Sequence, residues 1–142
     1  MRAALVSTPL DPNALLREVA DRTRGATALF VGTVRSLNEG REVKAIEYSA
    51  YDEMAVREMS IILGEAEQAN AGTLLVAEHR IGFIPVGSAS IVIAAAHAHR
   101  GRALDALRYA IDEIKTRAPI WKREIYADGS ESWVDPTKVA AE

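Results

Sequence analysis

A ten-residue segment near the C-terminus, KTRAPIWKRE at 115–124, constrains the fold more than any other part of the chain. An amphipathic helical pattern runs into it, and a pattern typical of a strand follows. Because Pro119 disfavours a helical conformation at Ala118, the helix must end there and the chain must turn. We expect the turn to fold Lys122 back toward Lys115.

Four cations lie in this segment, and they differ in what they imply. Lys115 and Arg117 end the helix, where the helix dipole favours positive charge whatever the function. The helix dipole does not explain the positive charges of Lys122 and Arg123, which lie on the strand. Since side chains alternate along a strand, we expect Lys122 to join one site and Arg123 to pair elsewhere. Two lysines crowded by arginines would bind an anion, and one of them would have a lowered pKa.

Composition limits the classes of function. The chain has 142 residues, which we expect to form one domain over 1–142, with 136–142 as a flexible tail. It has no cysteine, which excludes disulfides, Cys-ligated zinc, iron–sulfur clusters and thiol catalysis. The longest apolar run, 91–96, is far shorter than the ~20 residues of a membrane helix. With no signal-peptide pattern in its first residues, the chain is expected to be cytoplasmic and to make no membrane contact.

Charge is unevenly distributed along the chain. The net charge of −3 argues against nucleic acid as a general partner. Residues 97–124 carry a net charge of +3, which leaves −6 for the remainder. A basic site on an acidic body suits a small anionic ligand better than a long polyanion.

Periodicity predicts an α+β fold with three helices and a mostly antiparallel sheet. The run 91–96 is apolar at every position, as expected of a strand covered on both faces. The polar stretch 36–42 predicts a mobile loop. Strands are expected at 3–7, 25–34, 43–49, 74–80, 90–97, 120–126 and 131–134, and helices after Asp11 and at 51–70 and 101–117.

Histidines and arginines form a further candidate site around residue 100. His97 and His99 have a His-x-His spacing that can bind metal, with His79 as a third ligand. No carboxylate cluster lies near them in the sequence, so an anion site is the better interpretation. The free N–H groups of a helix N-terminus favour negative charge, and Arg100 and Arg102 would add bidentate contacts.

Arg35 follows a strand and precedes the polar stretch, a place where strands commonly deliver functional groups. The sequence contains no Gly-rich phosphate loop after a strand, no nucleophile elbow and no paired acidic motif. The residues alone therefore predict an anion-binding α+β domain with a candidate reactive lysine.

Six segments together resemble the large, catalytic subunit of molybdopterin synthase. The most specific is the lysine-containing segment, with a Gly-containing turn and WV after it. The matches keep the family's order and spacing, which no single motif would secure. They are GATALFVGTVR (25–35), EYSAYDEMA (47–55), HRIG (79–82), AHR (98–100), KTRAPIWKRE (115–124) and DGSESWV (128–134).

The resemblance implies an α/β-hammerhead-like fold and a homodimer of large subunits. A small ubiquitin-like sulfur-carrier subunit docks on each, which gives a heterotetramer. That subunit inserts its C-terminal Gly-Gly tail, activated as a thiocarboxylate, into the active site. Two successive sulfur transfers convert cyclic pyranopterin monophosphate, a pterin phosphate, into the dithiolene of molybdopterin without a metal or diffusible cofactor.

The resemblance also implies the site residues. Lys122 is assigned to positioning the thiocarboxylate or to proton transfer, and Lys115 to substrate contact and charge stabilisation, with the two roles exchangeable. The arginines of the substrate pocket suit the phosphate. The substrate-binding candidates are Arg35, His99, Arg100, Phe30, His79 and Arg80.

Two other interpretations stay open. One is a non-catalytic module that binds a partner's extended C-terminal tail by strand addition and cation capture, which needs the same basic groove but no turnover. The other is a metal-dependent enzyme that uses the three histidines.

Overall fold

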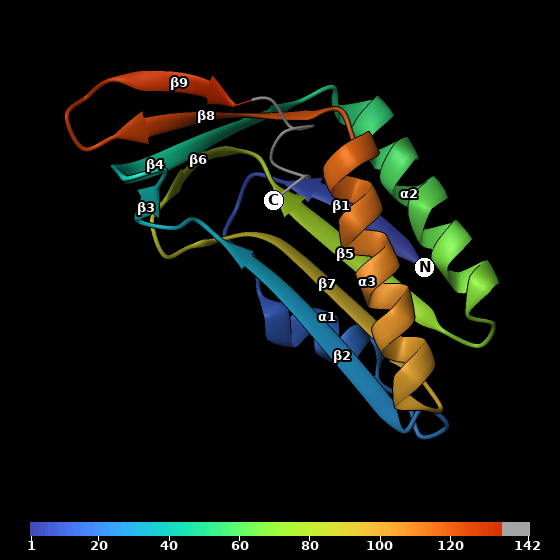
Figure 1. Cartoon of the computed structure of the whole chain (residues 1–142). Helices are drawn as coiled ribbons and strands as arrows, with labels where there is room; N and C mark the ends of the chain where they lie inside the picture. Colours follow the sequence, from blue (N-terminus) through green and yellow to red (C-terminus); the bar gives the residue numbers. More distant parts are fainter. Residues whose placement is uncertain (135–142) are drawn as a thin grey trace.

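The computed structural model describes residues 1–134, which form two sheets and three helices (Figure 1). The expected α+β class with mostly antiparallel strands is confirmed. The expected tail at 136–142 lies outside the described residues. In chain order the elements are β1 (Arg2–Val6), α1 (Pro12–Val19), β2 (Ala26–Thr33), β3 (Leu37–Asn38), β4 (Arg41–Ala50), α2 (Asp52–Ala69), β5 (Leu74–Arg80), β6 (Gly82–Pro85), β7 (Ala89–His97), α3 (Arg100–Arg117), β8 (Ile120–Tyr126) and β9 (Glu131–Val134).

None of the helices in residues 1–134 is both long enough and apolar enough to cross a membrane.

The first sheet has the strand order β1-β5-β7-β2 and carries most of the core. β1 runs parallel to β5, and the other neighbours are antiparallel. The inner strand β7 is buried on both faces, as its unbroken apolar run predicts. Its positions 91, 93 and 95 pack with α2 and α3, and positions 92, 94 and 96 pack with α1. Both faces of this sheet are therefore covered by helices.

The second sheet is built on β4, which pairs with β3, β6 and β8, while β8 pairs with β9. The strands β3 and β6 are absent from the sequence-based prediction. The mobile loop expected at 36–42 is wrong, because β3 and the start of β4 form a tight hairpin. Its turn residues Glu39 and Gly40 have φ values of 50° and 77°. Positive φ at both central positions is what a type I′ hairpin turn requires.

The end of α3 follows the prediction from Pro119. The helix stops at Arg117, and Ala118 is extended, with φ −71° and ψ 132°. β8 then begins at Ile120. Because Ala118 and Ile120 are buried together with Ile114 in the main core, packing holds the bend on both sides. The predicted turn is confirmed, and it places the last turn of α3 next to β8 (Figure 1).

The packing of α2 against this core gives a direct test of the fold. Ile62 is fully buried, whereas its neighbour Ile61 is 45% exposed. Ile62→Ala should lower the free energy of unfolding by about 2–5 kcal/mol, because it leaves a cavity in the core. Ile61→Ala removes the same atoms from the surface and should change it by about 0.5 kcal/mol or less. Urea unfolding measures both, and equal losses would contradict this orientation of α2.

Candidate active site

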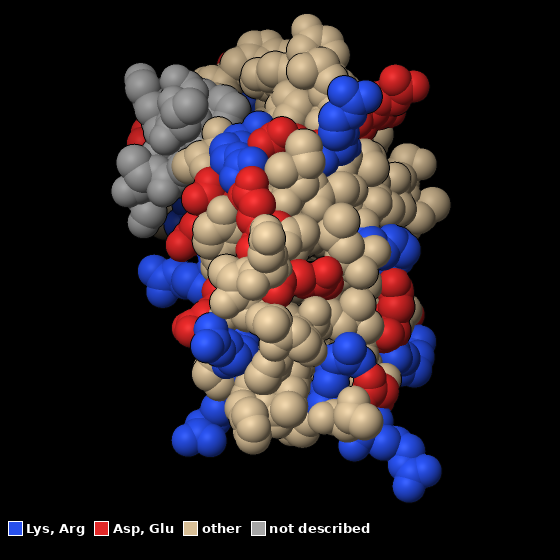
Figure 2. Space-filling view, turned by 90° about the vertical axis from the view of Figure 1, so that its right-hand side faces the viewer, with Lys and Arg blue, Asp and Glu red and all other residues tan. Residues whose placement is uncertain are grey.

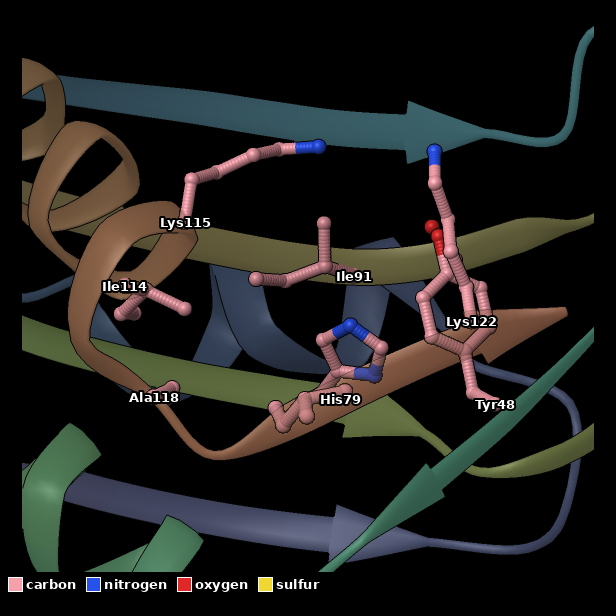
Figure 3. Close-up of a pocket in the computed structure, with 9 residues that line it drawn as sticks. Tyr48, His79, Ile91, Ile114, Lys115, Ala118 and Lys122 are labelled. Carbon is pink, nitrogen blue, oxygen red and sulfur yellow. The ribbon is translucent and has the colours of Figure 1, made fainter. Parts of the chain in front are cut away.

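A narrow cavity of about 60 Å³ lies where the end of α3 meets β8, and both predicted lysines reach it (Figure 3). Lys115 comes from the last turn of α3 and Lys122 from β8, and their amino groups extend toward the same side of the cavity. The structure therefore brings together the two lysines that the turn was expected to join. The cavity is lined by Tyr48, His79, Ser90, Ile91, Ile114, Lys115, Ala118, Ile120 and Lys122.

A larger cavity of about 1120 Å³ adjoins the narrow one. Two further predicted residues, Phe30 of β2 and Arg35 just beyond it, line this larger space. The two cavities share Tyr48, Ser90, Lys115 and Lys122 as lining residues. The lysines thus stand at the boundary between a small space and one wide enough for a small molecule.

Lys115 has a perturbed amino group, as expected for one of the two lysines. The residue as a whole is exposed, but its amino group extends over the narrow cavity, where it is partly removed from water. This loss of water lowers the pKa of Lys115 from its ordinary value, and the nearby charge of Arg35 lowers it further. The neutral amine is therefore more populated than on an ordinary surface lysine, which suits a group that exchanges protons.

Arg117 and Arg123 do not line either cavity, because carboxylates hold them elsewhere. Arg117 donates hydrogen bonds to Glu58 at 2.9 Å and Glu65 at 2.6 Å, both on α2. Arg123 donates to Glu47 at 2.7 Å. Figure 2 shows basic and acidic residues interspersed over the face that carries α2. The expected crowding of the lysines by these arginines is wrong, since Arg35 supplies that charge. The expected pairing of Arg123 elsewhere is confirmed.

His79 adds a neutral polar group to the narrow cavity. Burial lowers the pKa of His79 to about 4, and the charge of Lys115 also lowers it. Its Nδ1 lies 2.8 Å from the carbonyl oxygen of Arg80. Because a carbonyl oxygen only accepts, Nδ1 carries the hydrogen and donates it. The ring also packs edge-on against Tyr48, with ring centroids 4.8 Å apart. At neutral pH His79 is therefore uncharged and fixed in one tautomer.

His99 and Arg100 lie at the opposite end of α3 from Lys115. Arg100 and Lys115 are separated by fifteen residue steps along α3, which is a rise of about 22 Å. Neither His99 nor Arg100 lines the two cavities. Within one chain, the structure does not bring these two predicted substrate-binding residues to the lysines.

Arg80 is also separated from the cavity. Side chains alternate along β5, so Arg80 shares a face with Val76, which packs with α1. His79 shares the other face with Ala77, which packs with α2 and α3. Within one chain, the structure therefore does not bring Arg80, a predicted substrate-binding residue, to the cavity that His79 lines.

The three-histidine metal site does not form. Within residues 1–134, no group of three potential metal-binding side chains comes together. Both ring nitrogens of His97 are already used: Nε2 donates to the carbonyl of Ala71 at 3.0 Å, and Nδ1 accepts from the backbone N–H of His99 at 2.9 Å. These bonds hold the loop before α3 and leave His97 no lone pair for a metal.

Comparison with known proteins shows the family to which the chain belongs. A family model described as MoaE protein matches residues 5–117. The chain belongs to the MoaE family. A MoaE-family relative from rice (Oryza sativa subsp. japonica), named molybdopterin synthase catalytic subunit, is 45% identical over 124 residues, which cover 87% of this chain and 64% of that protein. The chain thus spans less than two thirds of the rice relative's length.

Bacterial proteins match over more of their length. A Bacillus subtilis molybdopterin synthase catalytic subunit is 39% identical over 94% of this chain and 84% of its own. The X-ray structure of molybdopterin synthase from Staphylococcus aureus superposes with a TM-score of 0.89 at 32% identity, and covers 93% of this chain and 96% of that one. The MoaE fold is therefore shared over nearly the whole chain.

Three residues of this MoaE-family site were not predicted as functional. Tyr48 lies opposite Lys122 in the pairing of β4 with β8, and Ser90 lines both cavities beside it. Glu124 is only 1% exposed, and one of its carboxylate oxygens accepts a 2.7 Å hydrogen bond from the amide of Asn38. Because Glu124 follows Lys122 by two residues on a strand, the spacing already placed both side chains on one face.

The lowered pKa of His79 predicts a pH-dependent stability. The pKa of His79 is 6.5 in the unfolded chain and about 4 in the folded protein. Between these values the unfolded chain holds more protons, so stability falls as the pH falls from 6.5 to 4 and is unaffected above 6.5. The full difference corresponds to about 3 kcal/mol. Urea unfolding at several pH values between 6.5 and 4 measures the free energy of unfolding. Over this interval the wild type should lose up to about 3 kcal/mol more stability than His79→Gln. Parallel losses would contradict a neutral buried ring.

Proposed function

We propose that this chain is the catalytic subunit of a molybdopterin synthase. It transfers sulfur from the C-terminal thiocarboxylate of a small ubiquitin-like subunit to cyclic pyranopterin monophosphate, in two steps that give the dithiolene of molybdopterin. The observation that carries this proposal is the meeting of Lys115 and Lys122 at the boundary between a narrow cavity and a wide one. Family membership and the names of the relatives support it.

The two cavities suit the two reactants. The narrow cavity, about 60 Å³ with mainly apolar walls, fits a slender tail whose residues have no side chains. The wide cavity, about 1120 Å³, fits a pterin phosphate and contains Arg35 to hold its phosphate. The tail and the pterin then meet where the lysines stand.

The lysines fit the charge that sulfur transfer creates. The thiocarboxylate, the phosphate and the tetrahedral intermediates of acyl transfer are all anionic. Two amino groups already in place stabilise that charge without having to reorganise as it develops. The lowered pKa of Lys115 also makes this lysine a suitable proton carrier, which leaves Lys122 to position the tail.

A sulfur-carrying partner follows from the composition. The chain has no cysteine and therefore cannot hold sulfur as a persulfide of its own. Sulfur must arrive on another protein or on a small molecule, and the narrow cavity favours a protein tail. The cytoplasm is the proposed compartment for this assembly.

A second copy of the chain completes the substrate site. His99 and Arg100 are about 22 Å of helix away from Lys115, so one chain cannot present both groups to one small substrate. In a homodimer, the start of α3 from one copy lies against the lysine cavity of the other. Arg100 then adds a second bidentate contact for the phosphate.

The lysine assignment predicts the effect of single substitutions. Lys122→Ala should lower the rate of molybdopterin formation by about 10²–10³, because a preorganised charge partner of the transition state is lost. Partner binding should stay nearly unchanged, since it depends on a wider surface. Lys115→Ala should lose a similar factor, with some loss of substrate affinity. The assay mixes purified protein, thiocarboxylated partner and pterin precursor.

Lys44→Ala is the matched control, because Lys44 is an exposed lysine of β4 that lines neither cavity. It should keep wild-type turnover. Wild-type turnover in Lys122→Ala would refute the proposed role. Binding of the partner by the wild-type protein without any product would instead favour the non-catalytic tail-binding module.

The homodimer is tested by mixing two variants that are each impaired when the pterin precursor is kept well below the Michaelis constant of Arg100→Ala. Arg100→Ala should mainly raise the Michaelis constant for the pterin precursor, and an unchanged constant would count against a phosphate contact. Mixed dimers of Arg100→Ala with Lys122→Ala contain one site with both groups intact, provided that each site draws on both copies. Activity should therefore return to about a quarter of wild type after random subunit exchange. No recovery above the separate variants would show that each chain uses its own residues.

A further inference from the structure

His79 presents a hydrogen-bonding atom to the narrow cavity that the proposed reaction does not yet use. The residue is 6% exposed, and it lies beneath the two lysine amino groups (Figure 3). Its Nδ1 is bound to the Arg80 carbonyl, and Nε2 has no hydrogen-bond partner among the described residues. Figure 3 shows that this second nitrogen points up into the space between Lys115 and Lys122. A ring nitrogen that points into a cavity is available for a hydrogen bond with a ligand that enters it.

The protonation state of the ring defines what this atom can recognise. Because Nδ1 carries the hydrogen, Nε2 holds a lone pair and can only accept. Burial keeps the ring neutral, and the charge of Lys115 on α3 adds to this effect. Lys122 of β8 lines the same cavity, and Tyr48 of β4 packs against the ring. A protonated ring would add a third positive charge to this space. The cavity therefore combines two cationic donors with a neutral acceptor placed between them.

This pattern matches the last residue of a peptide chain. A C-terminal glycine carries its negative charge on the carboxylate or thiocarboxylate, and a single carbon separates that group from the last peptide N–H. The anionic end requires donors, and the N–H requires an acceptor close to them. Ile91, Ile114 and Ile120 leave little width beside the acceptor, which favours a residue without a side chain.

We propose that His79 is a specificity-determining residue that accepts a hydrogen bond from the last peptide N–H of the incoming tail. The two lysines bind the anionic end at the same time, so the cavity recognises both polar groups of the terminal glycine, its N–H and its carboxylate or thiocarboxylate. This inference rests on the proposed function, because it takes the tail to be the occupant of the narrow cavity. It assigns the recognition of the tail's end to a residue that carries no charge.

The test compares two synthetic peptides that differ in a single backbone group. The parent is a short peptide ending in Gly-Gly with a free carboxylate, which stands for the thiocarboxylate. In its ester analogue, an oxygen replaces the last N–H, which removes the donor without adding bulk. Wild type should bind the ester about tenfold more weakly, since a donor is lost and Nε2 stays unsatisfied. Titration calorimetry measures both affinities.

Variants at position 79 separate a hydrogen bond from a general effect of the ester. His79→Phe keeps a flat ring but has no acceptor, so it should bind the two peptides within about twofold of each other. His79→Gln places an amide oxygen near the position of Nε2 and should restore part of the discrimination. Near-ultraviolet circular dichroism checks that each variant is folded.

The outcomes distinguish a failure of the role assigned to His79 from a failure of the proposed sulfur-transfer activity. Equal binding of parent and ester by wild type overturns the role of His79 without reference to any variant. An equal preference for the parent peptide in wild type and His79→Phe overturns it as well. Failure of wild type to bind the parent peptide removes both this inference and the proposed place of the tail. A fourth outcome is that the wild type discriminates between the peptides as expected but transfers no sulfur in the complete assay. This result supports the role of His79 in binding the tail and refutes only the proposed activity.

Discussion

The structure of the site depends on one constraint, the termination of α3 before Pro119. The proline ring prevents Ala118 from staying helical, and the buried side chains of Ile114 and Ile120 then fix where the chain goes next. Lys115 and Lys122 are seven residues apart in the sequence, and because the chain reverses between them both side chains line one cavity. A straight continuation of the helix would have placed the second lysine about two turns further on and in solvent.

The apolar packing that fixes the bend also sets the chemistry of the cavity. Isoleucine side chains exclude water from the walls, which lowers the pKa values of Lys115 and His79. Holding cations in such surroundings reduces the stability of the empty protein. An anionic ligand offsets this penalty when it binds, so the same groups that weaken the fold favour occupation of the site. The cavity is thus arranged for a negatively charged end of limited width.

The sequence was sufficient wherever a local rule decides the structure. The turn at Pro119, the twice-covered strand β7 and the Asp11 cap of α1, which accepts from Asn13 and Ala14, all follow from neighbouring residues. The sequence was insufficient where the structure of a segment depends on a residue or strand that lies far away along the chain. The short strands β3 and β6 exist because β4 offers them an edge. Likewise, Arg117 is held by Glu58 of α2, 59 residues away, and no periodicity reveals such a partner.

The length of α3 explains why the site residues predicted from the sequence fall into two groups. Helical hydrogen bonds make the element rigid along its axis, so thermal motion cannot bring its two ends together. His99 and Arg100 at the start, and Lys115 at the end, are therefore fixed apart in every conformation that keeps the helix. A motif match along the sequence does not record whether its residues meet within one chain or between copies. For residues on opposite ends of one helix to serve a single small substrate, the site must be assembled from more than one copy.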